Sequence, residues 1–146
     1  MKVKLRIDSQ VTEDSVSIEA RLMTESIQEL IHFAQHLGKE DKIHVKKENE
    51  IYLLDAKEIH RIYTENRQLR VRTAKDSYRA QQALYQLLQS LPDYFLQIFQ
   101  SEIINSRQIS HLRLTPNGLI QIFLKNGDQT YSSRRYLKSI KERLQL

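Results

Sequence analysis

Apolar and polar residues alternate in short runs over most of residues 42–146, with turn-forming residues between the runs. A period of two places every second side chain on one face, which is typical of a strand with one buried side. We predict strands at 43–45, 51–54, 59–64, 69–73, 77–79, 97–104, 109–114, 119–124 and 128–132. The turns at 115–118 and 125–128 each contain Asn-Gly, a pair that tolerates the positive φ of tight hairpins. The pattern predicts antiparallel strands that end in a β-meander.

Two segments of this region change to helical spacing. Residues 82–90 place Leu84, Leu87 and Leu88 on one side, and Pro92 follows shortly after. A basic helix is predicted from about Ser133 onward. The sequence therefore indicates an α+β protein in which antiparallel β-structure predominates and the helices are short.

The first 40 residues have a pattern of their own. Alternation predicts strands at 2–7 and 16–20, and Thr24 is the expected N-cap of a helix that ends at Gly38. A ββα annex of this size has too little core to be stable alone. We therefore predict an annex at 1–40, packed on the main domain at 42–146 or on a second copy of itself.

Composition narrows the class of protein. The 146 residues are 40% hydrophobic, which allows one domain with a substantial core. The absence of Cys excludes disulfides and thiolate metal sites. No apolar run approaches the roughly 20 residues of a membrane span, and the N-terminus lacks the apolar stretch of a signal peptide. We expect a soluble, cytoplasmic protein.

Motifs for catalysis or metal binding are absent from the sequence. His32 and His36 have the four-residue spacing of a zinc pair, but no third ligand accompanies them, so an amphipathic helix is the favoured interpretation. GxxxxGK[ST], GxGxxG and GxSxG do not occur. The carboxylates are dispersed, and most lie beside Lys or Arg. We expect no enzymatic activity, no cofactor and no metal.

Positive charge is concentrated outside the annex. Residues 1–40 hold five Lys and Arg against seven Asp and Glu, so the net charge of +5 leaves +7 for the remainder. Two segments, 61–79 and 134–143, carry +4 each, and Arg outnumbers Lys in both. Such runs are commonly solvated faces, but the planar guanidinium suits phosphates and guanine edges. Arg134 and Arg135 also stand at a helix start, where cations oppose the helix dipole, which favours an anionic partner.

The ordered set of motifs resembles the LytTR family of bacterial DNA-binding domains. Its parts are FLQIFQSEIIN, an Asn-Gly hairpin and SRRYLKSIKERL, preceded by EIYLL at 50–54, Glu58-Ile59 and Ile62-Tyr63. The resemblance covers roughly residues 42–146. It implies an elongated fold of short antiparallel strands that inserts loops, rather than a recognition helix, into successive grooves of double-stranded DNA.

The resemblance also implies which residues contact DNA. They lie in the turn after strand 59–64, in the polar pair before Ile103, and at the start of the last helix. The expected set is Asn66, Arg67, Gln68, Gln100, Ser101, Arg134, Arg135 and Lys138. We expect Arg135, with Arg134 as a second candidate, to read a base edge, and Asn66 or Arg67 to read a second groove. Asn105 is instead predicted to cap a turn, and Tyr136 and Leu137 to hold the last helix on the sheet.

Regulation is a further expectation from the resemblance. Many family members carry a phosphorylated receiver domain, but 40 residues are too few for one. Short members are encoded beside a small membrane protein that restrains them, so we expect the annex to dimerise the protein or to dock such an inhibitor. The alternative function is a basic interaction module for an acidic protein or an anionic membrane surface. A single-stranded RNA binder is a third class, which would need exposed aromatic residues on adjacent strands.

Overall fold

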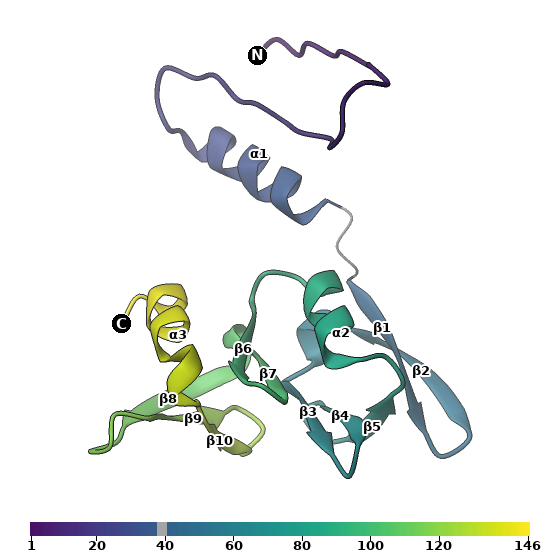
Figure 1. Cartoon of the computed structure of the whole chain (residues 1–146), viewed down its shortest axis with the longest axis vertical. Coiled ribbons are helices and arrows are strands. Elements are labelled where there is room, and N and C mark those ends of the chain that lie inside the picture. The colour runs from purple at the N-terminus through teal and green to yellow at the C-terminus, as the bar shows by residue number, and fades with distance from the viewer. Residues whose placement is uncertain (38–40) are drawn as a thin grey trace. The chain divides into compact units, whose positions relative to one another are not determined.

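The computed structural model describes residues 1–37 and 41–146 of the chain (Figure 1). The chain divides into two units, Met1–Leu37 and Gly38–Leu146. The predicted boundary between 40 and 42 lies close to this division.

The N-terminal unit contains one regular element, the helix α1 (Glu25–His36). Thr24 is its N-cap, as predicted, because its hydroxyl accepts a hydrogen bond of 3.2 Å from the Ile27 N–H. The predicted helix end at Gly38 lies outside the described residues.

The two strands predicted for the annex are not present, so its expected ββα arrangement is wrong for this structure. Residues 1–24 contain no strand, and Val3, Leu5 and Ile7 are 82–89% exposed. Alternation produces a strand only where a neighbouring strand completes the hydrogen bonds and a second layer covers the apolar face. A lone pair of strands is marginally stable at best, and neither condition is met within this unit.

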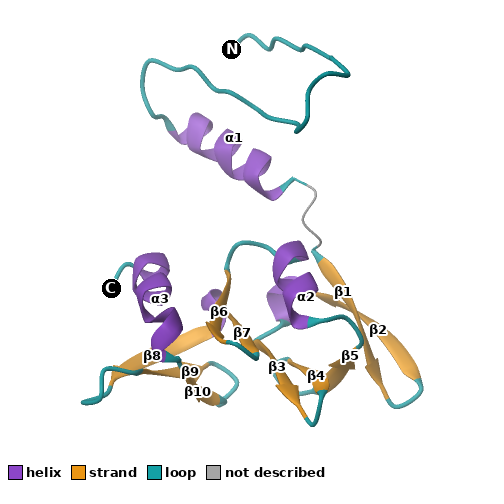
Figure 2. Cartoon of the chain, viewed as in Figure 1, coloured by secondary structure: helices purple, strands orange, loops and turns teal. Residues whose placement is uncertain are grey.

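The second unit is built on a large antiparallel sheet (Figure 2). Its seven strands follow the spatial order β2-β1-β5-β4-β3-β7-β6. Their bounds are β1 (Lys42–Lys47), β2 (Glu50–Asp55), β3 (Arg61–Glu65), β4 (Gln68–Arg72), β5 (Ser77–Ala80), β6 (Phe95–Phe99) and β7 (Glu102–Asn105). Strands predicted from alternation are therefore present at each of these places. The predicted strand 97–104 is in fact two, because Gln100 and Ser101 form a turn between β6 and β7.

A smaller sheet follows, with the order β10-β9-β8. It contains β8 (Ile109–Leu114), β9 (Ile120–Leu124) and β10 (Gln129–Tyr131). Gly118 and Gly127 have φ of 84° and 92° in the two connecting turns, the conformation for which Asn-Gly was predicted. The β-meander is thus confirmed.

Two short helices cover the sheets. Helix α2 (Leu84–Ser90) places Leu87 in a core that includes Val45, Ile62 and Val71 of the large sheet. Helix α3 (Leu137–Leu144) places Ile140 in a second core with Ile98, Ile104, Ile120 and Ile122. Tyr136 and Leu137 pack against this second core, as predicted. The α+β class with predominant antiparallel strands is confirmed.

Strand β7 separates the two hydrophobic cores. Ile103 belongs to the first core and Ile104 to the second, and both side chains are fully buried. Both faces of this strand are therefore covered, which explains why its sequence does not alternate. Because the hairpin β6–β7 is anchored on both sides, the turn at its tip is held on a rigid base.

Candidate nucleic-acid interface

The turn between β3 and β4 is the first of the three predicted contact places. Glu65 pairs with Gln68, so Asn66 and Arg67 form a two-residue loop with φ of 51° and 64°. Hairpins of this type favour Asn-Gly, because both positions need positive φ. Arg67 occupies the position that glycine normally takes, and its side chain is exposed. Backbone strain of this kind is frequent at functional sites.

The second place, Gln100 and Ser101, lies beside this loop. Tyr63 pairs with Glu102 across β3 and β7, and the Thr64 N–H donates to the Ser101 carbonyl at 3.0 Å. The tips of two hairpins that are about 35 residues apart in sequence are therefore adjacent. Gln100 is exposed, so its side chain is accessible to a ligand.

The third predicted contact place, the start of the last helix, is attached to β6, the other strand of the β6–β7 hairpin. The Ser133 N–H donates to the Ile98 carbonyl at 2.8 Å, and the neighbouring Ser132 hydroxyl accepts from the Ile120 N–H at 3.1 Å. A short 3-10 helix, Arg134–Tyr136, begins directly after this anchor, and α3 continues from it. Arg134 and Arg135 are exposed.

Lys138 is exposed in the first turn of α3. Because Ile98 precedes the Gln100–Ser101 turn by only two residues, the fold brings all three predicted contact places around the β6–β7 hairpin.

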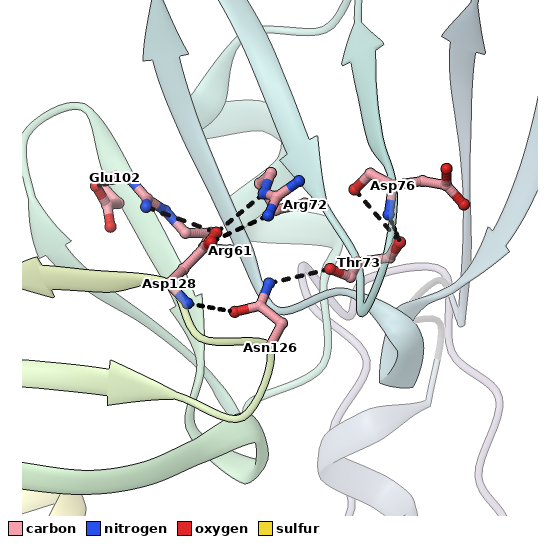
Figure 3. A network of polar contacts seen from close by, with 7 residues as sticks. All are labelled: Arg61, Arg72, Thr73, Asp76, Glu102, Asn126 and Asp128. Carbon is pink, nitrogen blue, oxygen red and sulfur yellow. Dashed lines mark hydrogen bonds and ion pairs between the residues drawn. The ribbon is translucent and has the colours of Figure 1, made fainter.

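Two arginines of the basic segment 61–79 have a structural role instead. Arg72 forms a bidentate pair with Asp128, at 2.9 Å from Nε and 3.0 Å from Nη2 (Figure 3). Arg61 donates to Glu102 at 3.1 Å and lies 3.8 Å from Asp128. The Arg61 and Arg72 side chains are 16% and 26% exposed, so neither is displayed for a ligand.

This polar cluster joins the two sheets. Asp128 belongs to the β9–β10 turn, and in the same turn the Asn126 amide donates to the Thr73 carbonyl at 3.0 Å (Figure 3). The hydrogen bond from Arg72 lowers the pKa of Asp128 below its usual value. Burial raises the pKa of Glu102, although Arg61 opposes that rise.

Asn105 caps the turn that follows β7, as predicted. Its side-chain oxygen accepts from the Arg107 N–H at 2.9 Å, and its amide donates to the Ile59 carbonyl at 2.9 Å. The side chain is fully buried, so it belongs to the framework and not to the exposed site.

Lys46 is a candidate contact residue that the sequence pattern did not indicate. It lies opposite Arg79 across β1 and β5, although 33 positions separate them. Alternation along β1 indicates that Lys46 faces away from the core, but it does not indicate which strand lies beside it. Only the strand order of the sheet shows that the basic segment continues into β1.

The described part of the chain lacks two further features, a cluster of metal ligands and a membrane-spanning helix. It contains no group of three or more His, Cys, Asp or Glu residues that could hold a metal ion. Likewise, no helix in this part is long and apolar enough to cross a membrane.

The sequence model described as LytTr DNA-binding domain matches residues 49–145. The chain belongs to the LytTR family. Two uncharacterized HTH-type transcriptional regulators of Staphylococcus aureus, from strains NCTC 8325 / PS 47 and COL, are each 36% identical to it over 146 residues. These alignments cover 100% of this chain and 99% of each relative. The LytTR chain is therefore a DNA-binding transcriptional regulator and not an enzyme.

A solved structure supports the same fold. The LytTr DNA-binding domain of a methyl-accepting/DNA response regulator from Bacillus cereus superposes with a TM-score of 0.70 at 15% identity. The match covers 73% of the LytTR chain and 99% of that domain. Although the S. aureus relatives are named HTH-type, α2 and α3 are separated here by strands β6 to β10, so these two helices do not form a helix-turn-helix.

Proposed function

We propose that this LytTR protein binds double-stranded DNA sequence-specifically by inserting the β3–β4 turn and the start of the last helix into successive grooves. The observation that supports this most strongly is the attachment of both segments to one hairpin. Ser101 accepts from Thr64 at 3.0 Å, and Ile98 accepts from Ser133 at 2.8 Å. Contact groups held on rigid elements lose little conformational freedom when they bind.

The proposed contact residues have separate parts in DNA binding. Arg135 reads a base edge, and Asn66 or Arg67 reads the second groove. Lys138 and Arg134 neutralise phosphates, which makes the affinity depend on salt. Gln68, Gln100 and Ser101 position the backbone of the duplex through neutral hydrogen bonds.

The substitution Arg135→Ala tests the proposal. It should weaken binding to the cognate site by about 1–3 kcal/mol, because a bidentate contact to guanine discriminates by that amount. A genomic selection with the full chain would first provide the cognate fragment, and fluorescence anisotropy would then measure the affinity.

Lys141→Ala is the matched control, because Lys141 is an exposed cation of α3, six residues after Arg135. It should change the affinity for cognate and scrambled DNA equally and only slightly. Unchanged discrimination between the two duplexes in Arg135→Ala would refute the role of Arg135. Equal binding of both duplexes by the wild type would refute sequence-specific recognition. In that case an acidic protein or an anionic membrane would become the better candidate partner.

We also infer that the N-terminal unit mediates homodimerisation or docks an inhibitory membrane protein. The support is its apolar surface, since Val3, Leu5, Ile7 and Phe33 are all at least 64% exposed. Apolar patches of this kind on a regulator commonly mark interaction sites.

Replacing Val3, Leu5 and Ile7 by Ser in the full chain should convert a dimer to a monomer in light scattering, because burial of apolar area drives such association. A control with Lys2, Lys4 and Arg6 replaced by Gln alters the intervening polar positions and should leave the dimer intact. A dimer that survives the Ser substitutions would exclude these side chains from the interface.

A further inference from the structure

Three cations lie in one row across the large sheet. Lys46 pairs with Arg79 across β1 and β5, and Arg79 pairs with Arg70 across β5 and β4. Residues that pair directly across strands project from the same face, so the three side chains are neighbours. Like charges in directly opposed positions are destabilising. Their placement has no structural benefit within the sheet.

The row projects from the face opposite the first core. The sequence neighbours of these cations, such as Val45, Val71 and Ala80, are buried, which places the cations on the other side. Arg79 is exposed, and Lys46 and Arg70 are half-buried. No side chain of the row has an ion pair or hydrogen bond with a described residue, in contrast to Arg61 and Arg72.

A groove links two members of the row, Lys46 and Arg79, to Gln68 of the proposed DNA site. It has a volume of about 410 Å³, and its lining includes Lys46, Arg79, Gln68 and Glu48. Arg67 belongs to the β3–β4 turn, and Gln68 directly follows it. The groove on the protein surface therefore begins next to the loop that is proposed to enter the DNA. The one carboxylate of its lining, Glu48, lies in the β1–β2 turn.

We propose that Lys46, Arg70 and Arg79 form a second contact surface, which binds the sugar–phosphate backbone of the same duplex beside the grooves. This inference rests on the proposed function. Strands are about 4.8 Å apart, so the row spans roughly 10 Å, or about three base pairs at 3.4 Å each. The continuity of the groove with the Arg67 turn favours DNA over an acidic protein or a lipid headgroup.

Such a contact has a distinct signature. Each phosphate neutralised by the row adds about 0.9 to the steepness with which the logarithm of affinity falls with the logarithm of salt. The contact carries no base information, so it strengthens binding to every duplex by the same factor. A residue that only stabilises the fold would not change this slope in a selective way.

The experiment compares the full chain with the variant Lys46→Gln, Arg70→Gln and Arg79→Gln. Binding to a duplex of arbitrary sequence, about three helical turns long, is measured by anisotropy over a series of KCl concentrations. The slope should fall by roughly 2.7 in the triple variant and by about 0.9 in Arg79→Gln alone. The single variant keeps the test valid if the triple variant folds poorly, which circular dichroism would show.

Lys47→Gln is the matched control. Lys47 is the next residue of the same strand, and it pairs with Asp76 at 2.9 Å instead of joining the row. Its substitution should leave the slope unchanged. A wild-type slope in Arg79→Gln would overturn the proposal. The proposal would also be overturned if the variant kept the wild-type salt slope for DNA but no longer bound phosphatidylserine vesicles. That result would assign the row to a membrane surface.

The failure of this inference is distinguishable from that of the proposed function. If the wild type prefers its cognate fragment but the variants keep its slope, only the second contact surface is wrong. If the wild type shows no preference for the cognate fragment, the proposed sequence-specific function fails, while the slope still reports on the row.

Discussion

Replacing Arg67 by Gly should make the protein more stable and a weaker DNA binder at once. Arg67 has φ of 64° in the β3–β4 turn. A residue with a Cβ pays about 1–2 kcal/mol for this left-handed conformation. Glycine avoids that cost but has a more flexible unfolded chain, which removes roughly 0.4–1 kcal/mol of the benefit. The net gain should be about 0.5–1 kcal/mol in the free energy of unfolding.

Urea unfolding followed by circular dichroism would measure this gain, and the melting temperature should rise by roughly 2–6 °C. Affinity for the cognate duplex should fall in the same variant. The loss should reach about 1–3 kcal/mol if Arg67 reads a base. If Arg67 only contacts a phosphate, the salt slope should instead decrease by about 0.9.

Glu48→Gly is the control for the backbone effect. Glu48 has φ of 57° in the β1–β2 turn, so glycine should stabilise it for the same reason. Its affinity for DNA should not fall, because Glu48 carries a negative charge. If Arg67→Gly destabilised the fold while Glu48→Gly stabilised it, the strain assigned to Arg67 would be wrong. If Arg67→Gly bound DNA like the wild type, the turn would have no part in recognition.

Two further predictions concern the framework. Asp128→Asn should lower the free energy of unfolding by about 2–3 kcal/mol in urea titrations, because it weakens two charge-assisted hydrogen bonds to a half-buried Arg72. Arg72 holds the pKa of Asp128 below its usual value of 3.8, so the stabilisation is complete above about pH 4 and is lost as the pH falls through the lower folded pKa. The variant should therefore lose less stability on acidification, and a wild-type acid profile would contradict this. Asn105→Ala should cost roughly 2–4 kcal/mol, since it leaves the Ile59 carbonyl and the Arg107 N–H without their partner. A loss below about 1 kcal/mol would mean that water replaces the amide.

Several local features of the chain could be predicted from the sequence. The strands, the Asn-Gly turns, the cap of α1 by Thr24 and the turn capped by Asn105 all depend on residues close in the chain. Hydrogen bonds and steric limits over a few residues decide such elements, so composition and spacing are sufficient evidence. The candidate contact residues came from the resemblance to a family. Seven of the eight are exposed and Ser101 is half-buried, and their role in binding DNA stays a prediction.

Pairing between distant segments could not be predicted in the same way. Arg61 and Arg72 looked like part of a basic patch, but Asp128 and Glu102 approach them from later strands. The residues around Lys46 did not indicate a basic cluster, but the pairing of β1 with β5 places Arg79 beside it. The N-terminal strands failed to form because alternation specifies one face of a strand and not its neighbour.

The sequence by itself determined which residues can form strands, turns and caps in this protein. The tertiary structure decided which cations remain exposed and which are neutralised in the joint between the sheets. The physical reason is that a period of two is a local property of the chain, whereas strand order and charge pairing depend on contacts between segments that are far apart in sequence.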